Sequence, residues 1–457
     1  MSSLEIFITN PISISSKSFY PRNYNPNFLI VKDGMKNNPT IKDYITGEIK
    51  GGSTPPAFLF TSEGNGIPFI KTSAVTRHFI NVNDLQSVNE KFHRTTIKRS
   101  ITRPYDVIYT MTGKFMGKAA MCPCTIPEMN MSQNSVVFHT NSRKEAAFLT
   151  IYLNSQINRI QVRGTYSITK QKFMNQSKIA SLRVFQYDAK YDYLMGEYLS
   201  AFDNYYKSVD TIKGIIEQFN SRHNLVFSDE AQYGFVVKPN AFEKRMLSPN
   251  YYRQDVALTI NGVVNGKEST ILDPERTSKG NEVGSANYTE EGVPFIKTSD
   301  IINYDVDYEP DCFCPEYFVS QLGQGIKKGD IIFAKDGKPG EIAIIEEDSN
   351  VVISSGLVKY HPKDDMERYW IFLLLASKYG DAYFKKWFVI ASTMLHLRQD
   401  FFGDFQIPEI NDEVMADYII PLKNAFEKKR TAYETIRVIK NKVEMSFTDE
   451  NMDLTTV

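Results

Sequence analysis

An eight-residue segment occurs twice in this chain. Residues 66–73 read GIPFIKTS, and residues 292–299 read GVPFIKTS. The copies start 226 residues apart in a chain of 457. This spacing is far longer than the roughly 20–50-residue periods of solenoids and propellers. The duplication therefore predicts two copies of a whole domain, and a function that uses two similar sites.

Further matches follow this octapeptide in the same order in both halves. The second motif is an apolar run that begins with an aspartate and is followed by two glycines, at 105–117 and 329–340. Two weaker matches pair 135–138 with 356–359, and 179–182 with 407–410. A single weak match could arise by chance, whereas four in the same order indicate a common domain scaffold.

Composition limits the class of protein. The length predicts two domains, and a hydrophobic content of 42% suffices for two cores. The net charge of −1 gives no overall basic signature, so any binding of nucleic acid would depend on local patches or on partner subunits. No stretch is apolar enough for a membrane-spanning helix, and no signal-peptide pattern precedes the first domain. We therefore expect a soluble cytoplasmic protein that does not bind membranes.

The four cysteines form two C-x-C pairs, Cys122/Cys124 and Cys312/Cys314. A structural zinc site needs four converging ligands. The two pairs lie at different places in the repeat, and reduced thiols are usual in a cytosolic protein. We expect no metal site.

The sequence predicts a mixed α+β fold with long helices. Short β-like runs and one apolar helical stretch, 146–160 or 369–386, occur in each half, and a heptad pattern then follows each half. The heptad seams include Phe202, Val209 and Ile216 in the first helix, and Ile419, Phe426 and Ile436 in the second. Lys429 and Lys440 interrupt the second seam, and Pro421 is expected to kink that helix or delay its start.

Two such helices can pack on each other as an antiparallel coiled coil that relates the domains by a pseudo-two-fold axis. The alternative is that each helix caps only its own domain. The expected segments are a first domain over 1–186, a first spacer helix over 187–225, a second domain over 226–410, a second spacer helix over 411–447 and a flexible tail over 448–457.

No catalytic motif is recognisable. The chain has no dinucleotide-binding GxGxxG, no P-loop, no HExxH and no Asn-Pro-Pro-Tyr type motif. Asp330, Glu341 and Lys335 could imitate a metal-dependent nuclease site, but the first half has no acid that matches Glu341. Because Asp330 directly precedes a strand, we expect it to cap a turn.

The repeated loops are rich in glycine, lysine and hydroxyl residues, which suit contact with phosphates. The candidate phosphate-binding residues in these loops are Lys71, Thr72, Lys114, Lys118, Lys297, Thr298, Lys335 and Lys338. Ordinary solvated loops with fold-defining turns are the alternative. The near-identity of the octapeptide favours a shared structural role over sequence readout, because residues that read different bases should differ between the copies.

The segments after each octapeptide differ most. Residues 74–104 are basic, and residues 300–328 are acidic at their start. The basic side chains, which could contact phosphates or guanine edges, are Arg77, Lys91, Arg94, Lys98, Arg99 and Arg103. Two similar scaffolds with different variable segments suit the reading of two different half-sites.

In its two octapeptides, its two D-[VI]-I-[YF]-x3-G-K segments and its two heptad helices, the chain resembles the specificity (S) subunit of type I restriction–modification enzymes. The resemblance covers essentially the whole chain in order. It implies two target recognition domains, one for each half-site of a bipartite double-stranded DNA sequence, read through the major groove. The long helices would then be spacer regions that fix the gap between the half-sites.

The resemblance also implies partners and a role in host defence. Two modification subunits would dock on the helices and supply S-adenosylmethionine-dependent adenine methylation. Restriction subunits would add translocation and cleavage that depend on ATP and Mg²⁺. This chain itself would bind no cofactor and catalyse no reaction. Pro421 and the acidic second segment depart from the pattern, and a metal-dependent nuclease or a scaffold that binds only proteins are the alternatives.

Overall fold

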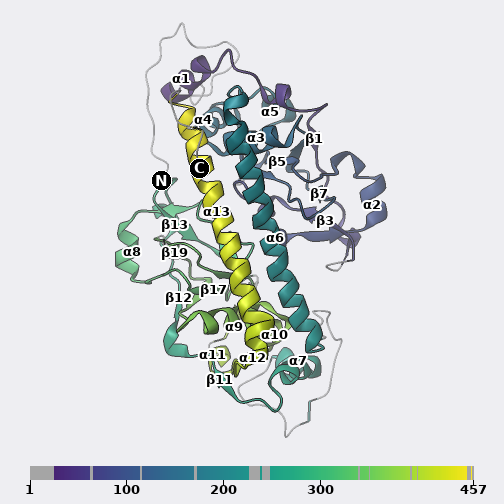
Figure 1. The fold of residues 1–457 in the computed structure, drawn as a ribbon, viewed down its shortest axis with the longest axis vertical. Helices are drawn as coiled ribbons and strands as arrows, with labels where there is room; N and C mark the ends of the chain where they lie inside the picture. Colours follow the sequence, from purple (N-terminus) through teal and green to yellow (C-terminus); the bar gives the residue numbers. More distant parts are fainter. Residues whose placement is uncertain are drawn as a thin grey trace. The chain divides into compact units, whose positions relative to one another are not determined.

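The computed structural model describes residues 25–61, 65–113, 116–168, 172–225, 237–238, 248–337, 340–348, 350–391, 394–398, 400–449 and 454. The chain divides into two compact units, Met1–Lys207 with Lys429–Val457, and Ser208–Lys428. Both units mix helices and strands, so the fold is of the α+β class and includes long helices (Figure 1).

The first half of the chain contains most of the first unit. Its elements are α1 (Pro26–Gly34), β1 (Lys50–Gly51), β2 (Phe60–Thr61), β3 (Ile67–Ile70), β4 (Gln86–Val88), α2 (Glu90–Thr95), β5 (Val107–Thr110), β6 (Ala119–Met121), β7 (Asn130–Met131), β8 (Ser135–Phe138), α3 (Arg143–Asn154), α4 (Gln156–Thr165), β9 (Ser167–Ile168), β10 (Lys172–Phe173), α5 (Gln176–Ala180) and α6 (Asp192–Arg222).

The second half contains most of the second unit. Its elements are α7 (Gln254–Val264), β11 (Ser269–Ile271), β12 (Thr277–Lys279), β13 (Val293–Ile296), β14 (Ile301–Ile302), β15 (Asp305–Val306), β16 (Phe313–Cys314), α8 (Tyr317–Leu322), β17 (Ile331–Ala334), β18 (Ile342–Ile344), β19 (Val352–Ile353), β20 (Leu357–Tyr360), α9 (Asp365–Ala376), α10 (Lys378–Trp387), β21 (Phe388–Ala391), β22 (Met394–Leu397), α11 (Asp400–Asp404), β23 (Gln406–Pro408), α12 (Asp412–Val414) and α13 (Ile420–Ser446).

The repeated motifs form the same sheets in both units. The second motif gives the central strand β5 of the antiparallel order β1-β8-β5-β6, and β17 of the antiparallel order β12-β20-β17-β18. The octapeptide strand β3 pairs antiparallel with β4 and parallel with β7. Its copy β13 pairs in the same way with β16 and β19. Each unit thus repeats one scaffold.

The ladder registers correct both weaker sequence matches. Ser135 lies opposite Thr110 and Leu357 opposite Ala334, so Ser135 corresponds to Leu357 rather than to Gly356. A one-residue shift matters in a strand, because it would move every side chain to the other face. The fourth match is displaced by more: residues 179–180 lie in helix α5, whereas residues 407–408 lie in strand β23. Short apolar runs do not fix register from sequence.

The apolar helical stretch of each half is two helices, where one was predicted. Ser155 separates α3 from α4, and Ser377 separates α9 from α10, both with extended backbone angles. The hydroxyl of Ser155 accepts a hydrogen bond from the backbone N–H of Asn158 at 3.3 Å, which caps the second helix. Such breaks are invisible to hydrophobic periodicity, which continues across them.

Each unit contains part of both long helices. In the first unit, the hydroxyl of Tyr191 lies 3.1 Å from that of Ser446, and Nζ of Lys429 lies 5.9 Å from the ring centroid of Tyr205. The helix segments therefore run antiparallel there. In the second unit, the rings of Phe219 and Tyr418 lie 5.4 Å apart.

Pro421 does not delay the start of the distal helix, as the sequence predicted it could. Helical structure begins at Asp412, and a π-helical turn, Met415–Ile419, immediately precedes α13. Proline lacks an N–H donor, and its ring crowds the carbonyl four residues earlier. The wider π turn accommodates both effects within a continuing helix.

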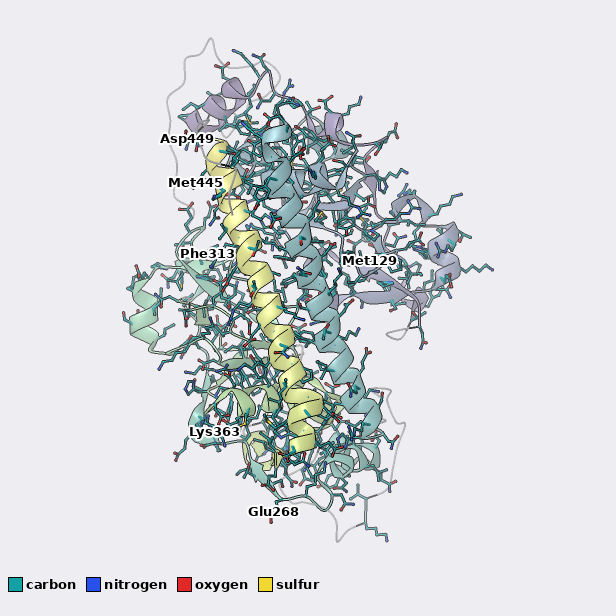
Figure 2. The ribbon with its side chains drawn as sticks, in the orientation of Figure 1. Met129, Glu268, Phe313, Lys363, Met445 and Asp449 are labelled. Carbon is teal, nitrogen blue, oxygen red and sulfur yellow. The ribbon has the colours of Figure 1, made fainter. Side chains whose placement is uncertain are left out.

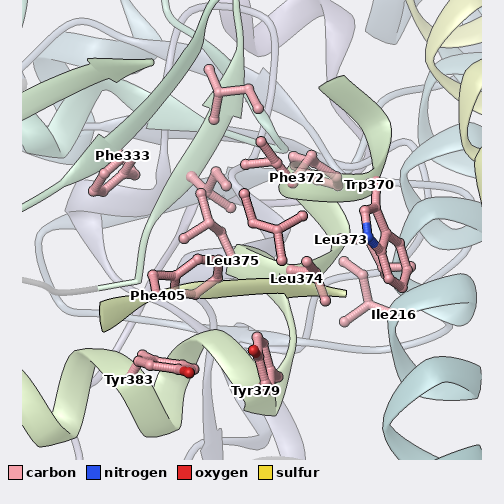
Figure 3. Packing of buried hydrophobic residues seen from close by; sticks show 14 of the residues in the cluster. Ile216, Phe333, Trp370, Phe372, Leu373, Leu374, Leu375, Tyr379, Tyr383 and Phe405 are labelled. Carbon is pink, nitrogen blue, oxygen red and sulfur yellow. The ribbon is translucent and has the colours of Figure 1, made fainter. Parts of the chain in front are cut away.

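The core of the second unit shows what the seam residues contact. Trp370 and Phe372 of α9 pack there with Phe333, and Ile216 reaches the same cluster from α6 (Figure 3). In the first unit, the ring of Phe79 lies 4.4 Å from that of Tyr205 and 5.8 Å from that of Tyr433. The helices therefore pack against the domain cores as well as against each other.

Candidate nucleic-acid interface

Each copy of the second motif begins with an aspartate that closes a turn. One carboxylate oxygen of Asp106 and of Asp330 accepts a hydrogen bond from the backbone N–H three residues earlier, at 2.7 Å and 2.8 Å. The other oxygen lies 2.8 Å from Nδ1 of His139 and 2.6 Å from Nδ1 of His361, respectively. The predicted turn-capping role of Asp330 is confirmed.

The lysines of the two octapeptides have different surroundings. Lys71 is exposed. Lys297 is half-buried, with its Nζ 4.2 Å from the ring centroid of Tyr288 and 2.8 Å from Sγ of Cys312. Burial acts to lower the pKa of Lys297, but the hydrogen bond to Cys312 and nearby charges outweigh it and leave the pKa raised. Lys297 is therefore a charged group held against an aromatic ring.

A hollow of about 260 Å³ lies where the two motifs of the second unit meet. Its lining includes Lys297, Thr298, Asp336 and Gly337. Asp336 contacts Nζ of Lys335 at 2.6 Å, which places an acid beside one of the predicted phosphate-binding lysines. In the first unit, the hydroxyl of Thr72 lies 3.2 Å from that of Ser132.

Of the remaining loop lysines, one is too buried to favour phosphate contact, and two lie outside the described residues. Lys118 is only 6% exposed. Lys114 and Lys338 lie outside the described residues. The repeated loops thus hold few exposed cations among the residues that the structure describes.

A basic face in the first unit is formed by α2 and the turns that follow it, and consists of Lys91, Arg94, Lys98, Arg99 and Arg103, all exposed. Arg94 forms an ion pair with Glu128. Arg99 donates a hydrogen bond to the hydroxyl of Ser53 at 3.1 Å. Arg77, which was predicted with this group, is half-buried and lies before β4.

The two variable segments differ in sequence but share one backbone framework. Strand β4 and helix α2 in the first unit correspond to β16 and α8 in the second. Val88 and Cys314 face the start of the octapeptide strands at equivalent positions. His78 and Tyr304 both have positive φ, 72° and 66°. Sequence comparison missed this framework, although the spacing of 226 residues between the two octapeptides continues through it.

The acids of the second variable segment are largely turned inward. Asp305 and Asp307 are each 7% exposed. Asp305 accepts hydrogen bonds from the backbone N–H of Val306 and the hydroxyl of Tyr308, at 2.7 Å and 3.1 Å. Asp300 accepts one from the backbone N–H of Lys297 at 2.9 Å. The acidic run therefore stabilises loops and does not form one exposed negative patch.

The geometry excludes the nuclease site that Asp330 and Glu341 suggested. Asp330 pairs with Ile345 at one end of the β17–β18 hairpin, and Glu341 pairs with Ala334 at the other. Four residues of strand separate the ends by ~13 Å, whereas metal ligands lie within ~2.5 Å of the ion. Within the described ranges, His, Cys, Asp and Glu side chains do not form a group of three that could hold a metal ion.

The four cysteines are free thiols. Burial raises the pKa of Cys122 well above its ordinary value. Burial, together with the nearby Asp203 carboxylate, raises the pKa of Cys124 to about 12. Burial also raises the pKa of Cys314. These three thiols are therefore poor nucleophiles at neutral pH.

The predicted seam residues all lie in the interior. They are at most 7% exposed and comprise Phe202, Val209, Ile216, Ile419, Phe426 and Ile436. In the part of the chain that the structure covers, no helix is both long and apolar enough to cross a membrane.

No protein-family model and no curated protein sequence matches this chain. Solved structures similar to it include the type I restriction–modification S subunit from M. genitalium, with 13% identity over 92% of this chain and 95% of that one, and a TM-score of 0.32. The HsdS subunit from Thermoanaerobacter tengcongensis aligns with 15% identity over 91% and 95%, at a TM-score of 0.28.

A chain from a structure on complex assembly and conformational transition of a type I restriction–modification system aligns with 15% identity over 89% and 95%, at a TM-score of 0.28. These identities and TM-scores are low. The function proposed below therefore rests on the duplication and the surface chemistry of this chain.

Proposed function

We propose that this chain is the non-catalytic DNA-recognition subunit of a type I restriction–modification complex. One observation carries the proposal: a single scaffold, with the same strand order and register, occurs twice and bears two different surfaces. Residues 74–104 hold six Lys or Arg and two acids, whereas residues 300–328 hold two Lys and six acids. One unit for each half-site of a bipartite DNA target accounts for this combination.

The basic face supports contact with DNA. Phosphate contacts supply most of the affinity of a protein for DNA and position it on the duplex. Lys91 and Lys98 expose their charges on the short elements that follow the octapeptide strand. This is the part of the scaffold whose sequence differs between the units, so it is suited to distinguishing half-sites.

The long helices support a spacer role. Helix α6 has 31 residues and α13 has 27, and each belongs partly to both units. A helix the length of α6 extends ~46 Å. As an antiparallel coiled coil, the pair would set the gap between the half-sites and offer related surfaces to two modification subunits.

In this proposal the partner subunits perform the chemistry. The modification subunits would bind S-adenosylmethionine and methylate adenine, and restriction subunits would use ATP and Mg²⁺ for translocation and cleavage. The complex would act on double-stranded DNA in the cytoplasm as part of host defence.

Methylome sequencing of cells with and without the gene tests the proposal. A bipartite adenine-methylated motif should be present only when the gene is present. The same result should be obtained in vitro with the chain and its modification subunits. Sequence-independent methylation, or no methylation at all, would contradict the proposal. Metal-dependent cleavage by the isolated chain would support a nuclease, and the absence of salt-sensitive DNA binding would support a scaffold that binds only proteins.

A further inference from the structure

Phe58 is an apolar ring that the first unit leaves 81% exposed. It lies in the short turn Ala57–Leu59, on a loop beside the basic face. At one end of the loop, Ser53 accepts a hydrogen bond from Arg99 at 3.1 Å. At the other end, the carbonyl of Leu59 accepts one from the backbone N–H of Asn89, the residue that caps α2, at 2.9 Å. The loop therefore runs alongside the elements that carry the basic side chains.

The loop is anchored on both sides of Phe58. Pro55 and Pro56 precede it and restrict the backbone. Phe60 follows it and packs edge-on against Phe69 of the octapeptide strand, with ring centroids 5.5 Å apart. An anchored loop that holds a phenylalanine in water forgoes the free energy of burying that ring, unless a partner covers it.

The second unit also exposes an aromatic ring, but from another segment. The turn Ser285–Asn287 precedes Tyr288, which packs against Phe295 at 5.5 Å, as Phe60 packs against Phe69. This turn carries Ala286 where the first unit has Phe58.

Among the residues of the second unit that the structure describes, the exposed ring is instead Tyr317, 56% exposed, at the start of α8. Helix α8 follows β16, whose Phe313 is labelled in Figure 2, as α2 follows β4. Phe58 and Tyr317 therefore both lie beside the end of the strand that pairs with the octapeptide, whereas Tyr193, 50% exposed, lies on α6.

We propose that Phe58 and Tyr317 are base-contacting residues, each of which presses its ring against base edges of one half-site. This inference rests on the function proposed above. The thymine C5 methyl group is an apolar feature of the major groove that aromatic side chains recognise. Around Phe58, the basic face would hold the flanking phosphates. Because the two rings come from different segments of one scaffold, they would meet different bases.

The test uses the complex of the full chain with its modification subunits and the duplex found by methylome sequencing. Binding is measured for the cognate duplex and for duplexes with either half-site scrambled. Phe58→Ala should weaken cognate binding about 10-fold, since no ring then covers the base edges. The effect of Phe58→Ala on binding should disappear when the half-site that Phe58 contacts is scrambled. Tyr317→Ala should behave in the same way for the other half-site.

Controls separate the outcomes. Ile30→Ala removes a 70% exposed side chain on α1 and should leave binding unchanged. The conservative variants Phe58→Leu and Tyr317→Phe test whether folding is kept. Melting curves of each variant measure the same property directly. Uracil, which lacks the C5 methyl group, then replaces the thymines of each half-site one at a time. At one position, this replacement should weaken DNA binding by the wild-type complex more than it weakens binding by the corresponding alanine variant.

The inference fails if both alanine variants bind every duplex within twofold of wild type, or if they weaken binding to all duplexes equally. The proposed function fails separately, if the wild-type complex does not distinguish cognate from scrambled duplexes.

Discussion

Nδ1 of His361 lies 2.6 Å from a carboxylate oxygen of Asp330, whose side chain is fully buried. The carboxylate also accepts the backbone N–H of Lys327, so it joins the turn before β17 to the end of β20. The first unit repeats the pair as Asp106 and His139. A paired buried acid that recurs in both copies serves the scaffold.

Asp330→Asn should therefore destabilise the second unit. Hydrogen bonds to a charged group contribute about 1.5–3 kcal/mol each, and the amide can replace only part of them. Urea denaturation should show a loss of about 1–3 kcal/mol in the free energy of unfolding. Asp348→Asn is the control, because Asp348 is 83% exposed and its carboxylate lies as far as 4.0 Å from Nζ of Lys328. An unchanged midpoint for Asp330→Asn would contradict a structural role.

Phe426→Ala should be among the most destabilising changes in the distal helix. Phe426 is fully buried, and its ring lies 4.9 Å from that of Phe372 and 5.7 Å from that of Tyr369. Truncation leaves a cavity and should cost about 3–5 kcal/mol in a denaturation experiment. Val438→Ala on the same helix, at a 41% exposed position, should cost within about 0.5 kcal/mol.

Lys297 and Lys71 occupy equivalent positions but should respond differently to removal. Lys297→Ala abolishes the packing of the ammonium group on the Tyr288 ring and should lower stability by about 0.5–2 kcal/mol. Lys71 is exposed, so Lys71→Ala should change stability by less than about 0.5 kcal/mol. Melting temperatures of the two variants measure the difference. Equal stability with equally weakened DNA binding would instead indicate that both lysines contact phosphates.

The regular elements could be predicted because they depend on local pattern. The apolar run 331–334 is strand β17 without a shift, and the heptad seam 202–219 lies within α6. These features follow from side-chain periodicity, which the sequence displays directly.

The rest depends on contacts that sequence does not display. Ser155 and Ser377 end helices through their own backbone conformation, while the apolar pattern continues across them. Asp305 and Asp307 look like surface charges in sequence and are buried by their hydrogen bonds. The exposure of Phe58 is equally invisible, because a phenylalanine in sequence indicates a core residue.

His93 should make the first unit sensitive to acid. The side chain is fully buried in α2, and its Nδ1 lies 3.2 Å from Nδ2 of Asn130. Burial, with the nearby Arg94 charge, holds the pKa of His93 below its ordinary value of 6.5. The unfolded chain therefore binds the proton more readily than the folded one. Stability should be constant above about pH 6.5 and should fall as the pH decreases below it, towards the folded-state pKa.

Melting temperatures between pH 5 and pH 8 measure this effect, and His93→Gln should reduce the slope below pH 6.5. A wild-type slope in His93→Gln would contradict the assignment.

Lys91→Ala with Lys98→Ala should weaken DNA binding through the electrostatic component. Both residues are exposed on the basic face. Removing one lysine from a phosphate should reduce the slope of log K against log salt by about 0.9, so the slope of the double variant should be smaller by about 1.8. The weakening should be similar for cognate and scrambled duplexes, because phosphates carry no sequence information. Lys36→Ala removes an exposed charge paired with Asp33 at 3.1 Å and is the control. A full wild-type slope in the double variant would show that DNA does not lie on this face.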